Sequence, residues 1–185
     1  MNLIFFGIQG SGKGTQAKLL AENHGFEIFE TGGELRKLAK EDSALGLKVK
    51  SIIESGNLVP TEVVMEIVEN FLNNAQSERI IFDGIPRNLE QSEMLRSLLK
   101  NHNIEYTAVH FTLSEEEALK RLMKRAEIEG RADDNEESIK TRIGIFYEKT
   151  VPVIESVSEN GNFIEIDASQ TIDKVNDSLT AKLGL

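Results

Sequence analysis

A glycine-rich loop that follows a short apolar run constrains this chain more than any other feature of its sequence. Residues 3–15 read LIFFGIQGSGKGT, and a helix is predicted from Lys13 to about Asn23. Glycine allows tight turns and removes the Cβ atoms that would block a phosphate. Successive N–H groups and the helix N-terminus then attract an anion, and Lys13 adds a mobile positive charge. We predict that the loop from Gly7 to Thr15 binds nucleotide phosphates. The contacts are expected at Gly10, Ser11, Gly12, Lys13, Gly14 and Thr15.

The loop departs by one residue from the strict phosphate-loop pattern. That pattern places Ser or Thr directly after the lysine, whereas Gly14 stands there and Thr15 follows. A glycine-rich turn without a ligand is the structural alternative, but it gives no purpose to a lysine at this offset. The hydroxyl of Thr15 is a candidate Mg²⁺ ligand.

The rest of the chain alternates short apolar runs with longer helical patterns, which is typical of an α/β fold with a parallel sheet. The runs show little polar alternation, as expected for strands that are buried on both faces. The predicted strands are Leu3–Phe6, Phe26–Phe29, Arg79–Phe82, Thr107–Leu113 and Phe163–Ile166.

The segment between the second and third predicted strands is too long for one crossover helix. It contains about fifty residues, and we interpret residues 31–60 as a small helical insertion. Pro60 begins a further helix that runs to about Asn73. Ser114 with Glu117, Asp134 with Glu137 and Thr31 with Glu34 have the spacing of helix-start capping boxes.

Composition limits the classes of partner. The 185 residues carry a net charge of −10 and include no cysteine. The charge argues against a nucleic-acid or membrane binder, and the missing thiols exclude disulfides and thiolate zinc sites. No signal peptide is visible, so we expect a cytoplasmic protein, and the acidic surface favours a monomer. Nucleotides are polyanions, so the arginines must gather in one place.

Five motifs, in order, resemble those of adenylate kinases and related nucleoside monophosphate kinases. The first is the loop GxxGSGKGT; the next are Thr31-Gly32 with Glu34-Leu35-Arg36, and GNLVPTE at residues 56–62. DGIPR at residues 83–87, with Gln91 four residues on, resembles a further family signature. Arg121 and Arg125, GRADD at residues 130–134, and Arg142 resemble the arginine pattern around the family's lid.

The resemblance implies a P-loop kinase fold: a five-stranded parallel sheet flanked by helices, an AMP-binding insertion at 31–60 and a short lid at 125–135. The implied reaction is MgATP + AMP ⇌ MgADP + ADP, with Mg²⁺ held through water by Asp83 and no zinc. Arg121 and Arg125 are implied to bind ATP. The implied AMP residues are Thr31, Gly32, Arg36, Val59, Gly84, Arg87, Gln91, Arg131 and Arg142. The implied catalytic residues are Lys13, Arg87, Arg121, Arg131 and Arg142.

Each of these residues has a structural alternative. For the arginines, the alternative is a solvated or salt-bridged position on the surface; this applies to Arg36, Arg87, Arg121, Arg125, Arg131 and Arg142. Thr31 could instead cap a helix, and Asp83 could be an N-cap. Gln91 could be an exposed residue on a helix. UMP/CMP kinase is the nearest competing function; Thr31 and Gln91 favour AMP, whereas Asn88 resembles the pyrimidine group. A non-catalytic nucleotide-binding module is the competitor from another class.

Gly33 is the main departure from the family pattern. Family members usually carry an aspartate there, which is thought to support the Mg²⁺ water shell. We therefore expect Asp83 to be the principal acid and Mg²⁺ affinity to be weaker. Ile85, in place of the usual Phe, is a mild packing change.

Overall fold

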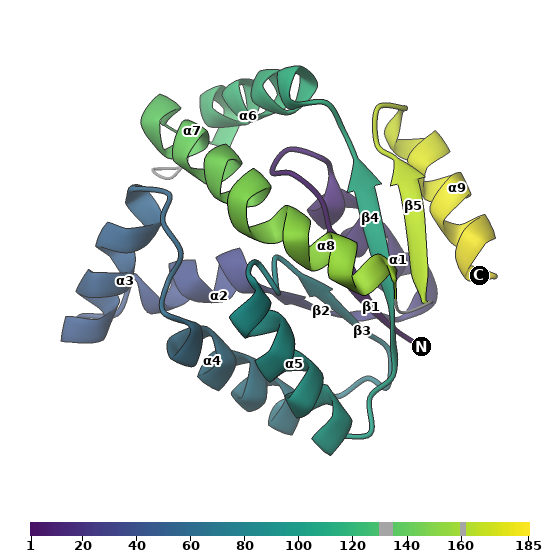
Figure 1. Ribbon diagram of the computed structural model, residues 1–185, viewed down its shortest axis with the longest axis horizontal. Coiled ribbons are helices and arrows are strands. Elements are labelled where there is room, and N and C mark those ends of the chain that lie inside the picture. Colours follow the sequence, from purple (N-terminus) through teal and green to yellow (C-terminus); the bar gives the residue numbers. More distant parts are fainter. Residues whose placement is uncertain (130–134, 160–161) are drawn as a thin grey trace.

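Parallel strand pairing builds the centre of the molecule. The computed structural model describes residues 1–129, 135–159 and 162–185. Within these ranges five strands form one parallel sheet in the order β2-β3-β1-β4-β5, with β1 in the middle (Figure 1). The strands are β1 (Asn2–Phe6), β2 (Glu27–Glu30), β3 (Ile80–Asp83), β4 (Tyr106–Thr112) and β5 (Phe163–Asp167). The predicted α/β fold is confirmed, and every predicted strand end lies within about one residue of the observed one.

The central strand is buried on both faces, which explains its unbroken apolar sequence. Leu3 and Phe5 pack into one core cluster, and Ile4 and Phe6 pack into the other. Helices α1 (Lys13–His24) and α9 (Ile172–Leu183) cover the first face. Helices α4 (Thr61–Asn74), α5 (Leu89–Asn101) and α8 (Val151–Ser158) cover the second.

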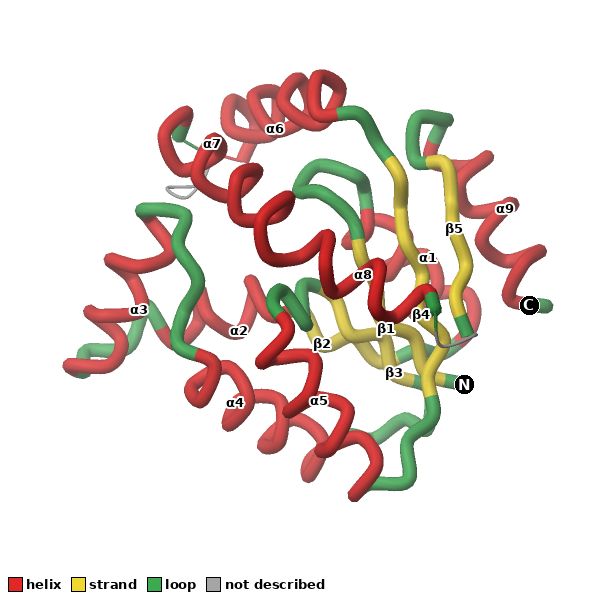
Figure 2. Tube along the Cα trace, in the orientation of Figure 1, coloured by secondary structure: helices red, strands yellow, loops and turns green. Residues whose placement is uncertain are grey.

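The segment predicted as an insertion contains two short helices beside the sheet. These are α2 (Thr31–Leu38) and α3 (Ala44–Glu54), and a long irregular connection then leads to α4 (Figure 2). Among its residues, Val49 is buried against the main core cluster. The insertion therefore shares the core of the sheet domain, and it lies at the carboxyl end of β2.

The helices that follow β4 have one predicted cap confirmed and one displaced. Ser114 Oγ accepts a hydrogen bond from the Glu117 N–H at 3.3 Å, and α6 (Glu115–Glu129) follows. For α7 (Glu136–Ile145) the cap is Asn135, whose Oδ1 accepts from the Ser138 N–H at 2.8 Å. The predicted start at Asp134 falls outside the described residues and is one residue early. A π-helical turn, η1 (Phe146–Thr150), joins α7 directly to α8.

Residues 130–134 of the predicted lid at 125–135 lie outside the described ranges; its first part belongs to α6. Among the residues that are described, no helix has both the length and the apolar character needed to cross a membrane.

The core cluster under α1 and α9 should be highly sensitive to truncation. Phe5 is 1% exposed, and its ring meets Phe111 edge-on with 4.9 Å between centroids. Phe5→Ala should lower the free energy of unfolding by about 3–5 kcal/mol, because the cavity cannot fully collapse. Leu47→Ala, at a side chain that is 62% exposed, is the control and should change it by less than about 0.5 kcal/mol. Urea unfolding measures both, and equal effects would contradict the assigned core.

Candidate active site

The glycine loop arches between the end of β1 and the start of α1 (Figure 2). Gly7, Gly10 and Gly12 have φ values of 147°, 87° and 87°, in the region that favours glycine. A Cβ on Gly10 would lie 2.9 Å from the Ala118 carbonyl oxygen, so the loop packs closely on α6. Gly12 is the N-cap of α1 and has no side chain to cap it. The N–H groups of the first turn are therefore presented to a ligand, as an anion site requires.

The Lys13 ammonium lies over this loop. It donates to the carbonyl oxygens of Gly7 (2.8 Å) and Ile8 (3.2 Å) and to Ser11 Oγ (3.4 Å). The pKa of Lys13 is lowered from 10.5 to about 8, chiefly by burial; Asp83 opposes this shift, and Arg87, Arg142 and Arg125 contribute to it. Lys13 is thus a cation in surroundings that disfavour its charge, and phosphate oxygens would relieve that cost.

Asp83 ends β3 beside the loop and is 7% exposed. Burial raises the pKa of this carboxyl group, and Lys13 opposes that rise. Within the described residues its carboxylate has no hydrogen-bond or ion-pair partner, and it lines the cleft. A buried, unpartnered oxygen donor fits a hard cation such as Mg²⁺. No cluster of three or more metal-ligand side chains occurs in the described part of the chain, so phosphates and water would supply the other ligands. Thr15 also lines the cleft.

A second, narrower chamber lies under the insertion. Its volume is about 60 Å³, against about 560 Å³ for the cleft at the loop. The predicted AMP residues that line it are Thr31, Gly32, Arg36, Val59, Gly84, Arg87, Gln91 and Arg142. The remaining one, Arg131, lies outside the described residues. Sequence positions from 31 to 142 are thus brought to one chamber.

The DGIPR turn fixes Arg87 between the chamber and the cleft. Arg87 Nε donates to the Gly84 carbonyl oxygen at 2.8 Å, and the Arg87 carbonyl accepts from Thr150 Oγ1 at 2.9 Å. Gly84 has φ 84°, and a Cβ there would lie 3.1 Å from Arg87 Nη2. The guanidinium is therefore preorganised by its own turn, in the planar geometry that suits a phosphate.

Thr31 and Gln91 meet the chamber in different ways. The capping interpretation of Thr31 is wrong: α2 begins at Thr31 with Glu30 as N-cap and no side-chain capping bond. Thr31 Oγ1 is buried and has no partner among the described residues, so it is available to a ligand. Gln91 is 2% exposed, and its Oε1 accepts from the Arg87 N–H at 2.8 Å. The amide nitrogen of Gln91 is then the end that a base can meet.

Asn88 has a structural role that the sequence did not reveal. Its side chain caps α5 by accepting from the Gln91 N–H at 2.7 Å. Helix capping is therefore a structural reason for an asparagine at this position.

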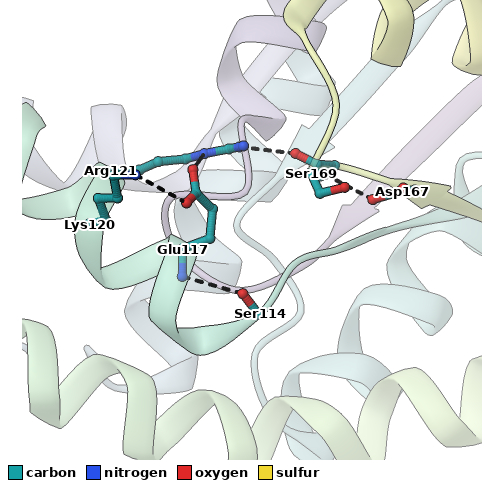
Figure 3. A network of polar contacts seen from close by, with 7 residues as sticks. Ser114, Glu117, Lys120, Arg121, Asp167 and Ser169 are labelled. Carbon is teal, nitrogen blue, oxygen red and sulfur yellow. Dashed lines mark hydrogen bonds and ion pairs between the residues drawn. The ribbon is translucent and has the colours of Figure 1, made fainter.

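Arg121 lines the cleft and is held there by two hydrogen-bond acceptors (Figure 3). Its Nε donates to Glu117 Oε1 and its Nη1 to the Ala168 carbonyl oxygen, both at 3.0 Å. Helix α6 is thereby tied to the segment after β5. Arg125, one turn further along α6, also lines the cleft. Arg121 thus combines an ion pair to Glu117 with a place in the cleft lining.

Two further groups of lining residues were not found from the sequence. Gln170, Thr171 and Ile172 line the cleft beyond the end of β5, and no motif signals them. Glu30 also lines the cleft, and its Oε1 accepts from Arg36 Nη2 at 2.8 Å. Its position at a strand end, next to Thr31, was the available signal.

The acidic chain gathers its cations here. The described lining contains two lysines and five arginines, against the acids Glu30 and Asp83. The cations are Lys13, Lys18, Arg36, Arg87, Arg121, Arg125 and Arg142. Six of the seven predicted from the sequence are among them, and Lys18 was not predicted. A positive cleft in a protein of charge −10 draws polyanions to one place.

This fold and cleft define the chain as a P-loop phosphotransferase. The family model described as "Adenylate kinase" matches residues 5–162. The chain is 39% identical over 184 residues to an adenylate kinase of Thermus thermophilus, covering 99% of this chain and 97% of that protein. It is 39% identical to an adenylate kinase of Hyphomonas neptunium over 185 residues (99% and 98%). It is 37% identical to one of Corynebacterium aurimucosum over 186 residues (100% and 99%). The chain belongs to the adenylate kinase family.

Nucleotide phosphates should return a proton to Lys13. With a pKa of about 8, the free enzyme holds Lys13 mostly neutral at pH 8.5. Bound phosphates favour the charged form, so ATP binding at pH 8.5 should take up a proton that it does not take up at pH 6.5. Calorimetry in buffers of different ionisation enthalpy measures this uptake. Lys13→Met should abolish it, and equal uptake in both proteins would contradict the assignment.

Proposed function

We propose that the chain catalyses MgATP + AMP ⇌ MgADP + ADP, with ATP on the glycine loop and AMP in the chamber under the insertion. One observation carries this proposal: five residues line both the chamber and the main cleft. They are Gly32, Arg36, Gly84, Arg87 and Arg142. Two nucleotides seated on either side of these residues would meet phosphate to phosphate.

Alignment and charge stabilisation explain how this arrangement would act, because phosphoryl transfer needs no protein nucleophile. An oxygen of the AMP phosphate attacks the γ-phosphorus of ATP. The bond from that phosphorus to the bridging oxygen breaks, and ADP leaves. Arg87 and Arg36 hold the attacking phosphate, while Lys13 and Arg125 stabilise the charge on the donor phosphates.

Mg²⁺, held through water by Asp83 with Thr15 as a further candidate, would neutralise charge on the β- and γ-oxygens. Arg121 would support the donor nucleotide. We extend to Arg131, on the resemblance alone, a role at the phosphates.

The adenine of AMP is proposed to lie against Thr31 and Gln91. Among the described residues, no partner is found for the Thr31 hydroxyl or for the Gln91 amide nitrogen, and this supports the placement. Val59 would pack against the base, because it lines the chamber and is 4% exposed. We further propose that the enzyme works as a cytoplasmic monomer without nucleic-acid partners. The absence of cysteine and the net charge of −10 support these points.

One assay separates the possible acceptors. Purified protein is given MgATP with AMP, UMP or CMP in turn, and ADP formation is followed, with MgATP alone as the blank. AMP should be the best acceptor. Turnover with UMP or CMP and none with AMP would assign the chain to the pyrimidine relatives. No turnover with any acceptor would make it a binding module.

Removing either central cation should nearly stop the reaction. Lys13→Ala and Arg87→Ala should each lower kcat by about 10²–10³-fold or more, since charge stabilisation dominates the barrier. Arg87→Lys keeps the charge but loses the planar fork, so it should recover only part of the rate. Arg79→Ala is the control, because Arg79 precedes β3 at the opposite end of the strand and binds the His24 carbonyl. A loss below about tenfold in Arg87→Ala would mean that the acceptor phosphate lies elsewhere.

A further inference from the structure

Glu30 and Asp83 occupy matching positions on neighbouring strands. Each is the last residue of its strand, and they are register partners in the parallel pair β2–β3. In-register residues of paired strands project to the same face of the sheet. Both line the cleft beside Arg36 and Arg87. Two carboxylates are therefore directed to the region where donor and acceptor phosphates would meet.

The Glu30 carboxylate also occupies the space beside Gly33. A Cβ on Gly33 would lie 3.3 Å from Glu30 Oε2 and 3.5 Å from Glu30 Cδ. An aspartate at position 33, the usual residue in the resemblance above, would start from that point. This chain thus has a glycine where an acid is expected, and a neighbouring acid that fills the same volume.

Glu30 forms an ion pair with Arg36, in which a phosphate can displace the carboxylate. Its partner Arg36 lies at 2.8 Å, and the two side chains are 45% and 30% exposed. Ion pairs with this exposure are weak. Arg36 also lines the acceptor chamber, where a phosphate dianion is the stronger partner for a guanidinium.

A second observation indicates a ligand here. Asp83 is 7% exposed. Its carboxylate lines the cleft and makes no hydrogen bond or ion pair to any described residue. Buried charged groups are ordinarily paired or bound to metal. A cation between the phosphates and this pair of acids would meet that requirement.

We propose that Glu30 is the second carboxylate of the Mg²⁺ water shell in this chain, and that the acceptor phosphate releases it for this role by taking over Arg36. This inference rests on the proposed function. It makes acceptor binding and metal binding mutually favourable. The acceptor phosphate frees Glu30 from Arg36, and the metal then neutralises the carboxylates of Glu30 and Asp83. It also predicts that acids at positions 30 and 33 are alternatives, since both together would crowd two negative charges.

The test measures metal binding in a complex that cannot react. Mn²⁺, followed by electron paramagnetic resonance, is titrated into protein with AMP and an ATP analogue that has a non-transferable γ-phosphate. Glu30→Gln should weaken Mn²⁺ binding by about tenfold, the scale of lost outer-shell ligands. Gly33→Asp alone should bring no gain, whereas Gly33→Asp in the Glu30→Gln background should restore most of the affinity.

The resting bond to Arg36 gives an independent readout without metal. In EDTA, Glu30→Gln should bind AMP about two- to fivefold more tightly than wild type, because no carboxylate competes for Arg36. Glu34→Gln is the control: Glu34 lies on the same helix as Arg36 but pairs with exposed Lys37 at 2.6 Å. It should change neither measurement.

Two results would overturn the inference. One is unchanged Mn²⁺ affinity in Glu30→Gln; the other is an equal gain from Gly33→Asp in both backgrounds. Failure of the proposed function is distinct, because wild-type protein would then form no ADP from MgATP and AMP, or bind no AMP at all.

Discussion

The burial of the Lys13 ammonium, in a cleft that also gathers arginines, is the constraint on which the rest of the site depends. The pKa of Lys13 falls to about 8 through burial and the charges of Arg87, Arg142 and Arg125. Each cation described in detail has a local acceptor that holds it apart from the others. Lys13 uses carbonyl oxygens of its own loop, Arg87 uses that of Gly84, and Arg36 uses Glu30. These acceptors are weaker partners than phosphates, so the site is preorganised yet ready to exchange them.

The sheet order gives this cluster its place. The glycine loop leaves β1 at the centre, and the DGIPR turn and the Glu30–Thr31 junction leave the neighbouring strands β3 and β2. Parallel strands bring all three junctions to one edge, where ligands of such sheets bind. The cleft at the glycine loop and the chamber under the insertion therefore meet because β1, β3 and β2 are adjacent, and Arg142 of α7 lines both.

The sequence was sufficient for the strands because their apolar runs are buried on both faces, and for the loop because Lys13 and four glycines leave little choice. It was misleading at Thr31, where T-x-x-E spacing resembles a cap although Glu30 holds that position. It placed Glu30 beside a strand end and Thr31, but it could not show the proposed role of Glu30, which depends on a strand partner some fifty residues away. Gln170 and its neighbours line the cleft through tertiary contacts, such as the hydrogen bond that Gln16 Nε2 donates to the Ile172 carbonyl oxygen at 3.0 Å. Contacts of this kind arise from tertiary packing, which no local pattern encodes.

The central claim is that donor and acceptor nucleotides bind together across Arg87. Calorimetric titration with two adenosines joined through five phosphates tests it most directly. The account predicts one ligand per chain, bound far more tightly than ATP or AMP alone, because both halves are engaged through one linkage. Binding no tighter than that of ATP would show that the chamber under the insertion does not hold the acceptor.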